Sequence, residues 1–131
     1  MTRRSAVVVA LALVLTACGD SGPPVTGAAA DGQDLFARTV LGSNAGCITC
    51  HSLKPDVVLV GPSLAAIGRD APNRQSGVSA ADYLRKSITA PDSFVLDGFD
   101  PGRMPQDWDE QLTAAEIDGL VEYLLTLGAE E

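Results

Sequence analysis

The sequence predicts an all-α domain in which about four short helices are joined by long loops. Three observations favour this fold class. Apolar residues recur at helical spacing, most clearly at Ile117, Leu120, Val121 and Leu124. Residues that cap helices precede several such stretches, and segments containing proline and glycine separate them. The length of 131 residues allows one domain but not two.

The first helix is expected to begin after Asp31, which would be its N-cap residue. Its apolar residues indicate that it runs to about Leu41. Helical spacing then places Leu35, Phe36 and Val40 on one face, which we expect to be buried.

Three further helices are expected. A short one covers residues 63–67 and ends at Gly68. The next covers residues 79–89, with its first residue, a serine, as the N-cap. The last begins with Thr113 and Glu116, whose spacing is that of a capping box, in which each residue binds a free backbone N–H group near the other.

The connections between these helices are long for so small a domain. Residues 89–109 contain no expected helix and include three prolines. A loop of this length argues against a compact domain unless the loop packs on something other than protein, such as a buried cofactor. The apolar run Val57–Val60 has the residue types of a short strand, but we interpret it as a loop that covers a cofactor edge.

The motif Cys47-Ile48-Thr49-Cys50-His51 has the Cys-x-x-Cys-His pattern of covalent haem attachment. Each thiol can add to one vinyl group of a haem and form a thioether. The histidine that follows is then held beneath the iron as an axial ligand. The motif therefore predicts one covalently bound haem c, with Cys47 and Cys50 as attachment sites and His51 as an iron ligand.

Two other interpretations of the motif are weaker. A thioredoxin-like redox pair belongs beside a βαβ pattern, which this sequence does not show. A structural zinc site usually needs four ligands, and the chain has only one further cysteine and no second histidine.

Residues 1–17 have the pattern of a signal peptide, with Arg3 and Arg4 before an apolar run too short to span a bilayer comfortably. The run ends in Leu15-Thr16-Ala17-Cys18-Gly19, which resembles a bacterial lipoprotein signal. That resemblance implies cleavage before Cys18 and lipid on its sulfur. Residues 18–30 would form the lipidated N-terminus and a flexible tether, and 31–131 the folded domain. Cleavage after Ala17 that leaves a free thiol is the alternative.

The chain is acidic, with a net charge of −8. Removing Arg3 and Arg4 with the signal segment leaves seven basic residues against seventeen acidic ones, a net charge of −10. Such a charge argues against nucleic acid as a partner. It favours redox proteins that present a basic docking patch, and it also keeps a small exported domain soluble.

Several segments, taken in order, resemble the class I c-type cytochromes. Gly32 and Phe36 match the glycine and aromatic residue of the family's first helix, and Tyr123 lies on the helix that would cross it. Gly61-Pro62-Ser63-Leu64 resembles the segment whose proline carbonyl accepts the proximal histidine's Nδ1–H. The resemblance implies the class I cytochrome c fold around one haem, with Pro62 supporting His51.

Met104 is the only methionine after the signal segment. It precedes Pro105 in a loop between helices, and the family places its axial methionine in such a Met-Pro pair. The resemblance therefore implies Met104 as the second iron ligand. Lys54 and other nitrogen donors remain remote substitutes, and filling the core is the usual alternative role of a methionine.

Three other residues are candidates for contact with the haem. Trp108 is the only tryptophan. It can pack on the haem rim or anchor the start of the last helix. Arg69 and Arg103 can pair with the haem propionates, although exposed surface positions are the more ordinary role for arginine.

Residues 31–128 are also similar to cytochrome c domains associated with haem–copper oxidases and nitric oxide reductases, through Gly61–Leu64, Tyr83–Ile88 and Gly98–Phe99 followed by Met104-Pro105. The resemblance implies an electron carrier of a respiratory chain, not an enzyme by itself. It would be lipid-anchored to a bacterial cell membrane and face the periplasm or the cell exterior. The alternatives are a gas-binding or sensing haem protein with a labile Met104, and an assembly lipoprotein with an incidental haem.

Overall fold

The computed structural model describes residues 24–129. The expected signal peptide, Cys18 and the first part of the expected tether, to residue 23, lie outside the described residues. The rest of that segment, residues 24–30, is described, and its last three residues begin a helix. Within residues 24–129, no helix is both long and apolar enough to cross a bilayer.

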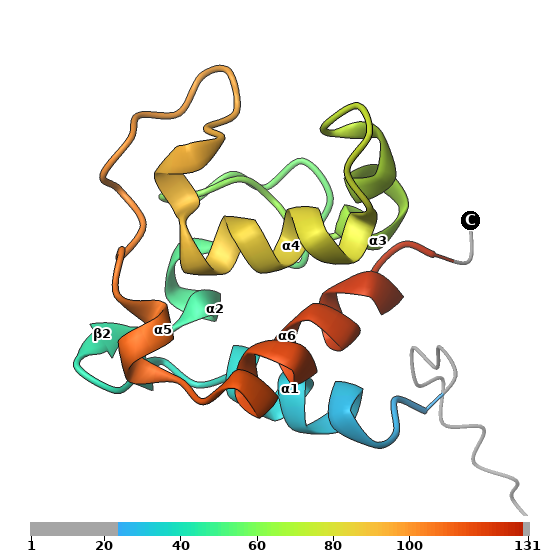
Figure 1. The fold of residues 1–131 in the computed structure, drawn as a ribbon, viewed down its shortest axis with the longest axis vertical. Helices are drawn as coiled ribbons and strands as arrows, with labels where there is room; N and C mark the ends of the chain where they lie inside the picture. Colours follow the sequence, from blue (N-terminus) through green and yellow to red (C-terminus); the bar gives the residue numbers. More distant parts are fainter. Residues whose placement is uncertain (1–23, 130–131) are drawn as a thin grey trace, which may run out of the picture.

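The described residues are mainly helical, which confirms the expected fold class. Among residues 24–129, three of the six α-helices are single turns, and there are also two short 3-10 helices (η) and one small hairpin (Figure 1). In chain order the elements are α1 (Ala28–Phe36), β1 (Val40–Leu41), β2 (Asn44–Ala45), α2 (Cys47–Cys50), α3 (Ile67–Asp70), η1 (Ala71–Asn73), α4 (Ala80–Thr89), η2 (Pro91–Ser93), α5 (Trp108–Gln111) and α6 (Ala114–Thr126).

The first and last helices, α1 and α6, lie against each other (Figure 1). Gly32 of α1 faces Gly119 of α6 so closely that a Cβ atom on Gly32 would overlap the carbonyl oxygen of Gly119. Beside this crossing, the rings of Phe36 and Tyr123 meet with their centroids 5.7 Å apart and their planes tilted by 58°. Both rings are buried. The expected close crossing, with Gly32 at its centre, is therefore confirmed.

The expected limits of the first helix were wrong. The helix begins at Ala28, after Gly27 turns the chain with φ of +63°, so Asp31 lies in the first turn and is not the cap. It ends at Phe36, because the chain then enters the β1–β2 hairpin and its backbone groups pair across that hairpin. Val40 lies in β1 and is 64% exposed, not buried on a helix face as expected.

The short helix expected over residues 63–67 was also misplaced, since α3 begins at Ile67. The preceding backbone is engaged elsewhere, because the Leu64 N–H donates to the Ser52 carbonyl at 2.8 Å. Gly68 lies inside α3 and does not end it. Its N–H donates to the Leu127 carbonyl at 2.9 Å, and a Cβ atom here would meet α6 backbone.

The two helices identified from their caps are confirmed. Ser79 precedes α4, and its Oγ accepts from the Asp82 N–H at 3.1 Å. Thr113 precedes α6 in a complete capping box with Glu116. Residues 89–109 hold η2 and the start of α5 but otherwise form the expected loop. Val57–Val60 form an exposed loop, not a strand.

We expect Thr113→Ala to lower the free energy of unfolding by about 1 kcal/mol at neutral pH. The substitution removes the Oγ1 atom that accepts from the Glu116 N–H and donates to the Glu116 carboxylate at 2.8 Å. Urea unfolding followed by circular dichroism measures the loss. Thr113→Ser keeps both hydrogen bonds and is the matched control, so equal losses in the two variants would contradict the capping role.

The same capping box makes a small part of the stability depend on pH. Hydrogen bonds from the Thr113 N–H and hydroxyl lower the pKa of Glu116 below its ordinary value of 4.5. The stabilisation is therefore present above pH 4.5 and is lost as the pH falls through the lower, folded pKa.

Candidate functional site

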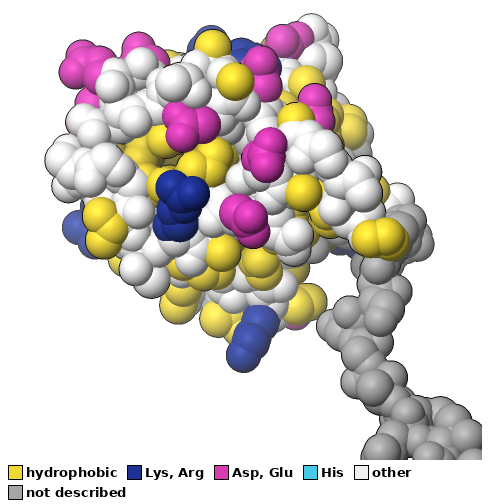
Figure 2. Space-filling view, turned by 90° about the horizontal axis from the view of Figure 1, so that it is seen from below, with side chains coloured by type: hydrophobic (Ala, Val, Ile, Leu, Met, Phe, Trp, Pro, Cys, Tyr) yellow, Lys and Arg dark blue, Asp and Glu magenta, His cyan; other side chains and the backbone are white. Residues whose placement is uncertain are grey.

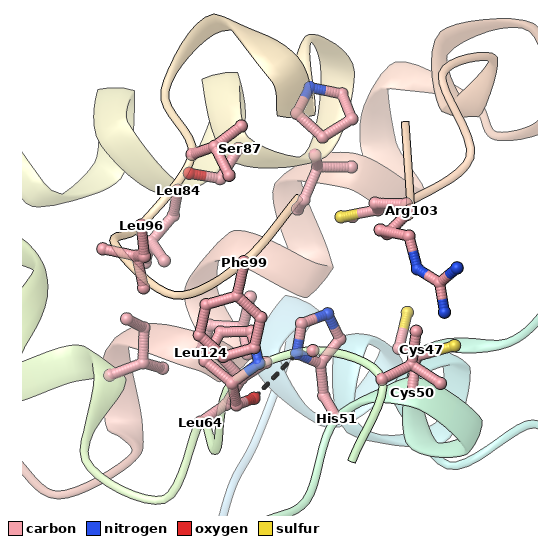
Figure 3. Close-up of a pocket in the computed structure, with 18 of the residues that line it drawn as sticks. Cys47, Cys50, His51, Leu64, Leu84, Ser87, Leu96, Phe99, Arg103 and Leu124 are labelled. Carbon is pink, nitrogen blue, oxygen red and sulfur yellow. Dashed lines mark hydrogen bonds between the residues drawn. The ribbon is translucent and has the colours of Figure 1, made fainter. Parts of the chain in front are cut away.

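A pocket lined mainly by apolar side chains lies between α4 and the α1–α6 pair (Figure 3). The Cys-x-x-Cys-His segment forms one part of its wall, and the loop between η2 and α5 forms another. Nearly every helix contributes to the lining. Its members include Phe36 of α1, Tyr83, Leu84 and Ile88 of α4, Trp108 of α5, and Leu120 and Leu124 of α6.

The two cysteines lie at the ends of α2, a single helical turn. The His51 N–H donates to the Cys47 carbonyl at 2.9 Å, and the Thr49 hydroxyl donates to the Gly46 carbonyl at 2.6 Å, so the turn is fixed from both sides. Both thiols are free and line the pocket. Burial raises the pKa of the Cys47 thiol to about 11, so this sulfur is uncharged at neutral pH. The spacing therefore presents two thiols and the imidazole to one cavity.

His51 is held by the segment that follows it. Its Nδ1 lies 2.9 Å from the Pro62 carbonyl oxygen, which can only accept, so Nδ1 carries the proton and donates (Figure 3). Backbone hydrogen bonds on either side of Pro62 fix the position of its carbonyl. The Gly61 N–H donates to the Cys50 carbonyl at 2.9 Å, and the Leu64 N–H donates to the Ser52 carbonyl at 2.8 Å. In the neutral imidazole this hydrogen bond leaves the lone pair on Nε2. Burial lowers the pKa of His51 and opposes its protonation.

Met104 also lines the pocket and is partly buried against the core. The Gln106 side-chain amide donates to the Met104 carbonyl at 2.8 Å, which helps to fix the backbone here. Lys54, the remote substitute, is exposed and is not among the lining residues. The fold thus brings the thioether of Met104 and the imidazole of His51 to one cavity, although the two residues are far apart in the sequence.

The family model for Cytochrome c matches residues 29–128. The chain belongs to the cytochrome c family. Members of this family bind covalent haem c, typically one per domain, and are typically electron carriers, not enzymes. No curated protein matches the chain closely enough for comparison.

The pocket of this cytochrome has polar atoms that suit a haem. The Trp108 Nε1–H and the Arg74 Nε–H are buried and have no hydrogen-bond partner among the described residues. Both residues line the pocket. Unpartnered buried donors are unusual in proteins, and haem carries two propionate carboxylates that accept hydrogen bonds. A mainly apolar cavity with two donors that have no partner among the described residues therefore fits this group.

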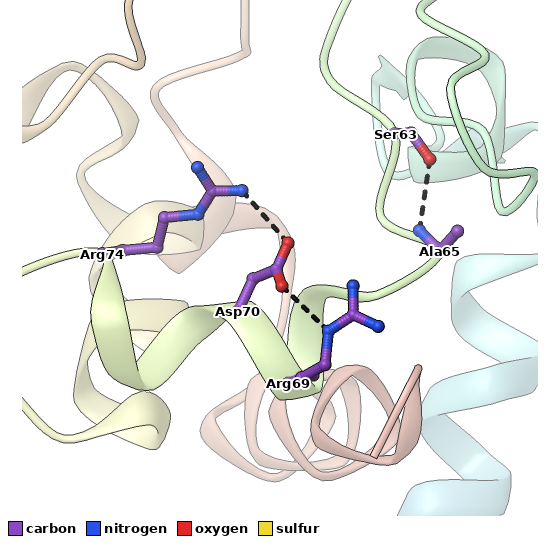
Figure 4. Close-up of polar contacts among 5 residues, drawn as sticks. All are labelled: Ser63, Ala65, Arg69, Asp70 and Arg74. Atoms are coloured by element: carbon purple, nitrogen blue, oxygen red, sulfur yellow. Dashed lines mark hydrogen bonds and ion pairs between the residues drawn. The ribbon is translucent and has the colours of Figure 1, made fainter. Parts of the chain in front are cut away.

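The arginines singled out from the sequence have different surroundings. Arg103 lines the pocket, and Figure 3 shows its guanidinium on the side where the two cysteines lie. Arg69 is not among the lining residues and pairs with the Asp70 carboxylate at 3.2 Å (Figure 4). Arg74 pairs with the same carboxylate at 3.5 Å and also reaches the pocket.

Three residues that line the pocket or hold its walls in place were not predicted from the sequence. Arg74 gave no signal, because one arginine in a polar loop looks like ordinary surface. Gly61 belongs to a motif that the sequence shows, but its own role is steric: a Cβ atom there would lie 2.8 Å from His51 Nδ1. Gly119 is the glycine of α6 that lies against Gly32 of α1. A glycine within a strongly helical pattern was the available signal for it.

Proposed function

We propose that this cytochrome is a membrane-tethered, monohaem carrier that transfers single electrons between components of a respiratory chain, with His51 and Met104 as the axial ligands of the iron. The observation that carries the proposal is the pairing of His51 Nδ1 with Pro62. It leaves Nε2 as the ring nitrogen free for iron, in the same pocket as the only methionine after the signal segment. Since the chain has one histidine, a second imidazole from the same chain is excluded.

The side chains around the pocket have distinct roles in this proposal. Cys47 and Cys50 form the two thioether bonds, and Pro62 keeps His51 in one tautomer and orientation. Trp108 and Arg74, whose buried N–H groups have no partner among the described residues, would donate to the propionates. When bound, haem supplies the one-electron couple of its iron. Met104 favours the ferrous state, because a neutral thioether raises the reduction potential.

The tether and the partners follow from the sequence and the surface charge. Lipid on Cys18 would hold the domain at a bacterial cell membrane, facing the periplasm or the cell exterior, and the residues between Cys18 and α1 would let it move. Acidic side chains gather over the upper part of the face seen in Figure 2, with a basic side chain near its middle and others toward its edges. Such a surface favours a redox partner with a basic docking patch and disfavours nucleic acid.

The test is the near-infrared absorption spectrum of the ferric holoprotein, where a weak band reports iron–sulfur bonding. We expect the wild type to show this band and Met104→Ala to lose it, because no other methionine follows the expected signal segment. The reduction potential of the variant should fall by on the order of 0.1–0.2 V, since axial ligands set haem potentials over a wide range.

Leu96→Ala is the matched control, since Leu96 also lines the pocket from the loop that carries Met104. It should keep the band. A wild-type protein with c-type haem but no band, which binds carbon monoxide readily when reduced, would overturn the His51–Met104 assignment. Such a result would favour a gas-binding function.

A further inference from the structure

One carboxylate fastens the loop that carries Met104. Asp92 lies in η2, directly after α4, and both of its carboxylate oxygens accept from the Gly102 N–H, at 2.8 and 3.0 Å. Gly102 precedes Met104 by two residues and has φ of +73°, so the chain turns sharply at the point where the carboxylate binds it. Asp92 and Met104 both line the pocket.

This hydrogen bond is not a local cap of η2, because it joins residues ten positions apart. The loop between η2 and α5 has no regular structure, and much of it is exposed. Two side chains bind the backbone of this loop. The Asp92 carboxylate accepts from the Gly102 N–H, and the Gln106 amide donates to the Met104 carbonyl. A charged acceptor makes the stronger hydrogen bond of the two.

A loop that carries a weak, neutral ligand must be held in place for that ligand to stay bound. We infer that Asp92 is a positioning residue, which keeps the loop closed so that the Met104 thioether remains on the iron. This inference rests on the proposed function, because it requires Met104 to be the ligand. Without the carboxylate, the open loop gains population, and an external ligand then competes more easily for the iron.

The experiment is an imidazole titration of the ferric holoprotein, with loss of the near-infrared band as the readout. We expect Asp92→Ala to bind imidazole about five-fold more tightly than the wild type. A buried hydrogen bond to a carboxylate would have a larger effect, but Asp92 is exposed and water weakens the interaction. Asp92→Asn keeps a neutral acceptor, so its imidazole affinity should lie between those of the wild type and Asp92→Ala. Asp97→Ala, which removes an exposed carboxylate from the same loop, should match the wild type.

A second readout separates positioning from general loss of stability. Hydrogen exchange at the Gly102 amide should be faster in Asp92→Asn and Asp92→Ala, while the urea midpoint changes little. A wild type without the band would overturn both the ligation and this inference. A wild type that shows the band, with equal imidazole affinities in Asp92→Ala and Asp97→Ala, would overturn this inference alone.

Discussion

Gly32→Ala is expected to lower the free energy of unfolding by about 3 kcal/mol or more, because the added methyl group meets backbone and not a movable side chain. The new Cβ would overlap the Gly119 carbonyl oxygen and lie 2.8 Å from the Leu120 nitrogen. The two helices would have to separate, and the Phe36–Tyr123 contact beside them would open. Alanine gains about 1 kcal/mol over glycine within a helix, which is too little to offset this loss.

Urea unfolding of the holoprotein measures the change, and two variants calibrate it. Asp34→Ala alters an exposed position of the same helix and should leave the stability nearly unchanged. Gly119→Ala should lower the stability less than Gly32→Ala. Its Cβ would lie 2.8 Å from the Ala28 carbonyl oxygen, whereas the Cβ on Gly32 would overlap the Gly119 carbonyl oxygen more closely. Wild-type stability in Gly32→Ala would show that the α1–α6 crossing is not as tight as described.

Gly61→Ala is expected to lower the yield of haem-loaded protein per polypeptide about ten-fold or more. Loss of a residue that orients a metal ligand commonly weakens metal binding by at least this factor. The new Cβ would lie 2.8 Å from His51 Nδ1 and 3.0 Å from Nε2. The imidazole must then leave its hydrogen bond with Pro62 and tilt away from the orientation that the backbone fixes. A haem stain, normalised to the amount of polypeptide, measures the yield.

Gly77→Ala is the matched control for this experiment. Gly77 has φ of +78°, so alanine there is strained, but no atom lies within 4 Å of the added Cβ. It should lose some stability and still bind haem normally. Equal haem yields in the two variants would show that a general loss of stability, and not the contact with His51, explains the effect of Gly61→Ala.

The sequence predicted the parts of the fold that have a local cause. The helices after Ser79 and Thr113 are specified by side chains that bind the backbone within the next turn, so their starts were correctly placed. The haem motif is also local, since α2 is a single turn that holds both thiols. These features depend on residues that are neighbours in the chain.

The features that could not be predicted depend on contacts between distant residues. The first helix ends at Phe36 because a hairpin follows, and two strands of two residues give no periodicity to detect. Residues 63–66 stay extended because Ser52 holds the N–H of Leu64. The two unpartnered donors, on Arg74 and Trp108, can be recognised only when the burial of each atom is known.

The contact between α1 and α6 has a consequence for the order in which the chain can fold. These helices are the first and last of the described domain, so Phe36 lacks its partner Tyr123 until the final helix is present. Leu120 and Leu124 complete the pocket wall at the same time. A chain still missing its last helix therefore leaves the thiols of Cys47 and Cys50 open. We expect haem to reach them most easily at that stage, before the 13 residues of α6 close the domain.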